Sequence, residues 1–85
     1  MNYDADDVDR ERKFRARLRG ARSDLRLTQV KLATLAGLNP QVVAHYESGY
    51  RFPSVHSLIR LASALGVTLD YLLGLTDHEP ARSLL

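Results

Sequence analysis

The stretch "TQVKLATLAGLNPQVVAHYESG", from Thr28 to Gly49, decides the fold of this chain. It contains two helical patterns of about eight residues each, with almost no loop between them. Thr28 is an N-cap for the first pattern, and Gly37 stands where a left-handed C-cap belongs. Asn39 caps the second pattern, and Pro40 suits its first helical position. Helices this short are marginal on their own, so we expect flanking helices to hold the pair.

A longer helical pattern precedes the pair and begins near Asp9. Its apolar residues recur at the spacing of a single helix face, and they are Phe14, Leu18, Ala21 and Leu25. Arginines fill the other faces. Arg15, Arg17 and Arg19 cannot all point one way, so we expect a general attractive field from them and no specific contacts.

Two more helical patterns follow the pair. Ser54 caps "VHSLIRLASAL", which Gly66 ends, and Thr68 caps the short "LDYLLG". The buried stripe of the longer one is predicted to be Val55, Leu58, Ile59, Ala62 and Leu65. No strand pattern exceeds four residues. The fold class is therefore predicted to be all-α, with five helices.

A tight helix–turn–helix pair has a recognised use. The turn holds the second helix away from the body, so that its exposed face can enter the major groove of DNA. The inner side needs small and apolar residues: Ala33 where the helices cross, and Leu38, Val43 and Tyr46 in the interior.

Composition limits the classes of protein that this chain can represent. Its 85 residues suffice for one small domain, and it has no cysteine for a disulfide or a thiolate metal site. The three histidines have no metal-ligand spacing, so neither a metal nor a cofactor is expected. No apolar run is long enough to span a bilayer, and the acidic start is no signal peptide, so we expect a cytoplasmic protein.

Charge is distributed unevenly along the chain. Five of the ten acids lie in the first eleven residues, whereas residues 12–60 carry ten bases and two acids, a net charge of +8. A basic body suggests a polyanionic partner, although a solvated helix face is an alternative explanation. We expect a disordered acidic segment at 1–8, a helix-turn-helix domain at 9–75 and a short tail at 76–85.

Several phrases of the sequence resemble the helix-turn-helix domain of the Cro/phage-repressor family. They are "LRGAR" (18–22), "LTQVKLATLAGL" (27–38), "YESG" (46–49), "RFPS" (51–54) and "LIRLASALGVTLDYLLG" (58–74). The resemblance implies a compact five-helix, repressor-like domain that binds double-stranded DNA as a regulator, usually as a dimer.

The resemblance also assigns roles to residues. Gln29 matches the family's phosphate-gripping Gln, and Gln41 can pair bidentately with adenine. Val42 and Ala44 suit contact with a thymine methyl, and His45 suits guanine or phosphate. The residues expected to contact DNA are Thr28, Gln29, Asn39, Pro40, Gln41, Val42, Ala44, His45, Tyr50 and Arg51.

Two positions depart from the family pattern, and one pair conforms to it. Pro40 replaces a long polar base-reading side chain, and Tyr50 replaces a common Lys, with Arg51 beside it supplying charge. Arg22 and Glu47 match a family ion pair that joins the first helix to the end of the reading helix, so Glu47 is expected to be structural.

Three apolar residues near the end of the last helix, Tyr71, Leu73 and Leu75, are predicted to form a homodimer interface, because an apolar remainder in so small a domain suggests a partner surface. No nucleophile–base set accompanies the fold, so no enzyme is expected. The alternative is an antitoxin or a restriction–modification controller, which would also bind a partner protein.

Overall fold

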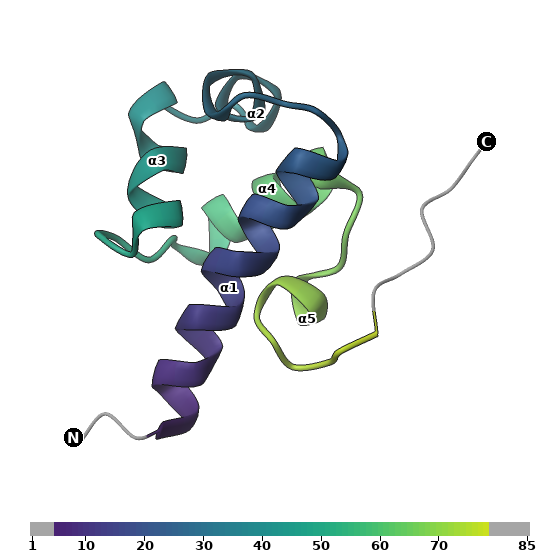
Figure 1. Ribbon diagram of the computed structural model, residues 1–85. Coiled ribbons are helices and arrows are strands. Elements are labelled where there is room, and N and C mark those ends of the chain that lie inside the picture. The colour runs from purple at the N-terminus through teal and green to yellow at the C-terminus, as the bar shows by residue number, and fades with distance from the viewer. Residues whose placement is uncertain (1–4, 79–85) are drawn as a thin grey trace.

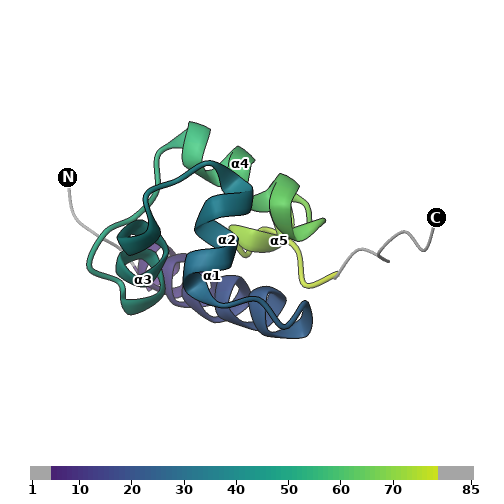
Figure 2. The ribbon, with the colours of Figure 1, turned by 90° about the horizontal axis from the view of Figure 1, so that it is seen from above.

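Five helices follow one another in the computed structural model, which describes residues 5–78. Their bounds are α1 Ala5–Asp24, α2 Gln29–Ala36, α3 Pro40–Ser48, α4 Val55–Leu65 and α5 Leu69–Leu72. Figures 1 and 2 show α3 and α5 on opposite sides of the molecule, with α1 running between them. The predicted all-α, five-helix architecture is confirmed for this part of the chain.

The helix ends follow local rules that the sequence displays. The side chains of Thr28, Asn39, Ser54 and Thr68 each accept a hydrogen bond from a backbone N–H in the first turn of the helix that follows. Gly37 ends α2 with φ +69°, a left-handed conformation that disfavours any side chain with a Cβ. The chain can therefore leave α2 and enter α3 within three residues.

One core joins the helices. The largest side chains with almost no exposed surface come from all five of them: Phe14, Leu18, Leu32, Val43, Leu61, Leu65 and Leu72. Each such side chain stabilises the fold by about 1.5–3 kcal/mol relative to exposure. Ala33 is fully buried at the α2–α3 crossing, and Leu38, Val43 and Tyr46 belong to or pack against the core, as expected.

Three expectations about these elements are wrong. The first helix begins at Ala5, before the expected Asp9, so residues 5–8 are helical. It ends at Asp24, and Leu25, beyond that end, is 39% exposed. On α4, Val55 and Ile59 are exposed, and Leu61 is buried in their place because the core lies on the face that Leu58, Leu61 and Leu65 share.

Between the end of α5 and residue 78 the chain forms no further helix. Thr76 and Asp77, assigned to a tail beginning at residue 76, are hydrogen bonded to Arg17 of α1. The expected disorder of residues 1–4 and the remaining tail, 79–85, lie outside the described residues. None of the described helices combines the length and the apolar character needed to cross a membrane.

Candidate nucleic-acid interface

The turn between α2 and α3 is closed by backbone hydrogen bonds. Leu38 N–H donates to the Ala33 carbonyl over 2.8 Å, and Gly37 N–H donates to the Thr34 carbonyl over 3.2 Å. Asn39 then accepts from the Gln41 N–H over 3.0 Å, so α3 begins immediately. This arrangement sets the direction in which α3 leaves the body.

The outer side of α3 is less open than the sequence suggests. Asn39, Pro40 and Gln41 are exposed at its beginning, and Ala44 is half-buried further along. Val42, predicted to be exposed, is partly buried and packs against the core. The expectation of a fully exposed Val42 is therefore wrong, because part of its side chain is covered by the core. Among the side chains predicted to read bases, Gln41 is exposed, whereas Val42, Ala44 and His45 are partly buried.

His45 and the loop after α3 form the other end of this surface. The ring of His45 lies 5.0 Å from that of Tyr50, and Tyr50 is 72% exposed. The Arg51 guanidinium lies 5.8 Å from the centre of the Tyr50 ring, and Arg51 N–H donates to the His45 carbonyl. The loop thus presents an aromatic ring and a cation beside the last turn of α3.

Glu47 is the buried charge at the inner side of α3. Its side chain is 3% exposed, and Arg22 grips both carboxylate oxygens, Nε to Oε2 over 2.6 Å and Nη2 to Oε1 over 3.0 Å. Arg19 Nε lies 3.7 Å from Oε1. The Arg22–Glu47 pair predicted from the sequence is present, and it ties α1 to α3.

The ionisation of this pair follows from its contacts. Burial alone would raise the pKa of Glu47, but hydrogen bonds from Arg22 and Gln29 and the nearby guanidinium charges outweigh it and hold that pKa below its ordinary value. The hydrogen bond to Glu47 raises the pKa of Arg22. Both groups are charged at neutral pH.

Gln29 connects this pair to the first turn of α2. Its Nε2 donates to Glu47 Oε1 over 3.0 Å, a contact that sequence reasoning missed. An amide nitrogen carries two hydrogens, so one remains for a phosphate oxygen. Glu47 accordingly fixes which way the Gln29 amide faces. The phosphate contact itself stays a prediction.

Comparison with known proteins assigns the family. A family model described as helix-turn-helix matches residues 18–72, which is more than half of the chain. The chain belongs to the helix-turn-helix family of the Cro/C1 type. It is 32% identical over 62 residues to the CTXphi transcriptional repressor RstR of Vibrio cholerae, covering 73% of this chain and 55% of RstR. It spans 34–57% of the length of several curated relatives that it matches.

Solved structures of helix-turn-helix proteins have the same fold. The restriction–modification controller C.AhdI of Aeromonas hydrophila is 37% identical, with a TM-score of 0.70 over 76% of this chain and 97% of that chain. The P22 c2 repressor, solved in complex with a synthetic operator, is 28% identical, with a TM-score of 0.68 over 71% of this chain and 91% of that chain.

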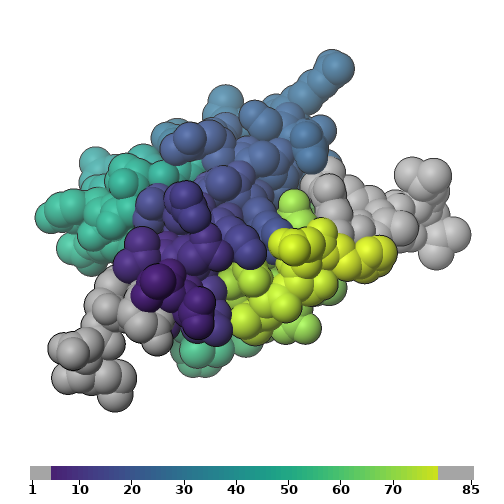
Figure 3. All heavy atoms as spheres, turned by 60° about the horizontal axis from the view of Figure 1, so that its bottom comes forward, coloured from purple at the N-terminus to yellow at the C-terminus, as the bar shows by residue number. Residues whose placement is uncertain are grey.

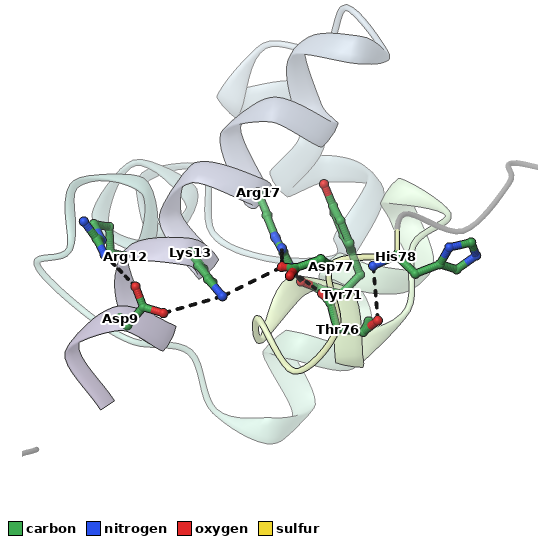
Figure 4. Close-up of polar contacts among 8 residues, drawn as sticks. All are labelled: Asp9, Arg12, Lys13, Arg17, Tyr71, Thr76, Asp77 and His78. Atoms are coloured by element: carbon green, nitrogen blue, oxygen red, sulfur yellow. Dashed lines mark hydrogen bonds and ion pairs between the residues drawn. The ribbon is translucent and has the colours of Figure 1, made fainter. Parts of the chain in front are cut away.

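The segment after α5 is fastened to α1 beyond the family match. Arg17 Nη1 donates to the carbonyls of Tyr71, over 2.7 Å, and Thr76, while Nη2 bonds Asp77 over 2.7 Å (Figure 4). The same guanidinium lies 4.4 Å from the centre of the Tyr71 ring. Sequence reasoning missed this clamp because Arg17 and Asp77 are 60 residues apart.

The three residues predicted for a dimer interface are not equivalent. Tyr71 and Leu73 are partly buried against the core, whereas Leu75 is 56% exposed. Of the three, Leu75 is the one that is exposed, and Tyr71 and Leu73 keep only part of their surface accessible. Within residues 5–78 no three or more His, Cys, Asp or Glu side chains gather in a way that could hold a metal ion.

Proposed function

We propose that this protein is a sequence-specific DNA-binding transcriptional regulator that acts as a repressor on an inverted-repeat operator. The observation that carries the proposal is the contact of Glu47 with both Arg22 and Gln29. A buried carboxylate holds the reading helix and the first turn of α2 in one rigid unit. That unit can set Gln41 on a base while Gln29 faces the backbone.

The relatives support the same conclusion. RstR is described as a transcriptional repressor, and the P22 c2 repressor was solved on its operator. We expect no catalysis, because regulators of this family act by binding. The protein is expected to act where the DNA lies, in the cytoplasm of a bacterial cell.

Binding as a homodimer is part of the proposal. A single reading helix contacts too few base pairs for a unique genomic site, and two-fold pairing places half-sites about 34 Å apart. Leu75, with the exposed parts of Tyr71 and Leu73, is the surface proposed for pairing.

Selection from a random duplex pool tests the central proposal. The full chain is mixed with the pool, the bound duplexes are sequenced, and the enriched motif is measured against scrambled duplexes. We expect an inverted repeat with half-sites about one helical turn apart. Enrichment of no motif would contradict sequence-specific binding, and a motif without two-fold symmetry would contradict the dimer.

A second candidate function is control of a restriction–modification gene pair, with or without a partner protein. The resemblance to C.AhdI favours it, since this chain covers 97% of that controller. The neighbouring genes distinguish the candidates: an endonuclease gene supports the controller, and a toxin gene supports an antitoxin. Co-purification with the product of the neighbouring gene would support a partner protein.

A further inference from the structure

The basic side chains of α1 point to two sides of the helix, one toward α5 and the other toward α3. Figure 3 shows α1 as a ridge between α3 on one flank and the segment after α5 on the other. Lys13 and Arg17 reach Asp77 on the α5 flank, and Figure 4 shows them already engaged there. These two cations thus share the Asp77 carboxylate, and Lys13 also pairs with Asp9 over 3.5 Å.

Arg15 is the exception among these bases. Arg10 pairs with Asp7, Arg12 with Asp9, and Arg19 and Arg22 both reach Glu47. For Arg15, no hydrogen bond or ion pair occurs within residues 5–78. Arg15 is partly buried and reaches Gly49 at the end of α3; it lies two residues and about 200° around the helix from Arg17.

The Arg15 side chain lies across the end of the reading helix. A Cβ placed on Gly49 would come within 3.1 Å of Arg15 Cδ and 3.2 Å of its Nη1, so a larger residue there would require the arginine side chain to shift by a few tenths of an ångström. Gly49 also has φ +83°. The partial negative charge at the C-terminal end of α3 favours a cation at this place. It can therefore stabilise the Arg15 guanidinium without a carboxylate partner.

A hollow of about 70 Å³ opens at this point, between α1 and the loop after α3. One water needs only ~15 Å³ of such space, so the hollow admits a larger group. Glu11, Arg15, Tyr50 and Arg51 line it, together with Phe14 and Phe52, whose tilted rings lie 5.0 Å apart. Two guanidinium groups and one carboxylate leave a net positive charge.

We propose that Arg15, which lies outside the family match, binds one backbone phosphate of the DNA together with Arg51. The proposal rests on the DNA binding proposed above. A phosphate lying beside the last turn of α3 would accept hydrogen bonds from both guanidinium groups. The site extends the contact with DNA from the reading helix onto the long α1. Glu11 limits its strength by repelling the phosphate.

The test compares Arg15→Gln with Arg12→Gln, a matched control whose arginine is 71% exposed and paired with Asp9. The dissociation constant is measured on a scrambled duplex and on the selected duplex, from 50 to 200 mM salt. We expect Arg15→Gln to weaken both duplexes by the same factor and to reduce the salt slope by about one per bound domain. Arg12→Gln should leave the slope unchanged.

Two further measurements complete the test. Glu11→Gln should tighten binding to both duplexes, and thermal unfolding should show that all three variants fold. If Arg15→Gln lowers stability but leaves the slope at the wild-type value, Arg15 only caps α3 and the phosphate site is wrong. If the wild-type chain binds no duplex, the proposed DNA-binding function is wrong, and the phosphate site is wrong with it.

Discussion

Gln29 Nε2 lies 3.0 Å from Glu47 Oε1, so a hydrogen bond links the first residue of α2 to the last turn of α3. Glu47 also accepts two hydrogen bonds from Arg22. The Glu47 carboxylate therefore links α1, α2 and α3. It also fixes the position of Gln29, the proposed phosphate contact, relative to the reading helix α3. Most of the testable consequences concern this carboxylate or the surface that it positions.

Glu47→Ala should lower the free energy of unfolding by about 3 kcal/mol, because it leaves the Arg22 guanidinium partly buried without its partner. Urea unfolding measures the change. Asp9→Ala, which breaks an exposed pair with Arg12, is the control and should leave the midpoint almost unchanged. Replacing both members of the buried pair, Arg22→Met with Glu47→Leu, should recover part of the loss. Equal losses for Asp9→Ala and Glu47→Ala would contradict this account.

Low pH should reduce the free energy of unfolding through protonation of Glu47. The pKa of Glu47 in the folded protein is below its ordinary value near 4.5, so the unfolded chain binds the proton more tightly. The stabilisation is complete above the ordinary pKa and is lost as the pH falls through the folded one. We expect the stability difference between wild type and Glu47→Gln to shrink between pH 6 and about 3. A difference that stays constant over that range would show that Glu47 is not the titrating group.

Substitutions of Gln41 and of Arg51 should have different effects on DNA affinity and base preference. Gln41 is exposed at the beginning of α3, so Gln41→Ala should weaken the selected site by about 1–3 kcal/mol and relax the base preference at one position. Arg51→Ala should weaken all duplexes by a similar factor. Binding to a panel of single-base variants of the site separates the two. If the selected motif is unchanged after Gln41→Ala, the base-reading role belongs to Val42, Ala44 and His45 instead.

Salt should reduce DNA binding steeply. If a dimer neutralises about six phosphates, its affinity should fall ~10³-fold between 50 and 200 mM salt. We expect Lys13 and Arg17 to contribute little to this salt dependence, because they are paired with Asp77 on the flank away from α3. Lys13→Gln should therefore leave the salt slope unaltered. A flat response of the wild type to salt would refute phosphate-based binding.

Pairing of two chains should depend on Leu75. It is 56% exposed, so Leu75→Asp should preserve the fold while it weakens self-association and cooperative binding to the inverted repeat. Val8→Asp is a matched control, since Val8 is 53% exposed at the far end of α1. Analytical ultracentrifugation of the free proteins and of their complexes measures both. A wild-type complex with one chain per operator would remove this interface.

The sequence by itself determined the parts of the structure that depend on a few neighbouring residues. N-cap side chains bond backbone N–H groups two or three residues away, and a glycine ends a helix through its own φ. The caps at Thr28 and Asn39, and the turn at Gly37 between them, were therefore predictable. The Arg22–Glu47 pair was also predicted, but only through the resemblance to a family.

Tertiary structure decided which faces and partners those helices use. An apolar stripe on α4 can be drawn through Ile59 or through Leu61, and only the positions of α2 and α5 select Leu61 for the core. The Gln29–Glu47 bond and the Arg17–Asp77 clamp join residues 18 and 60 positions apart. No local pattern encodes such pairs, because their geometry exists only after the core has brought the helices together.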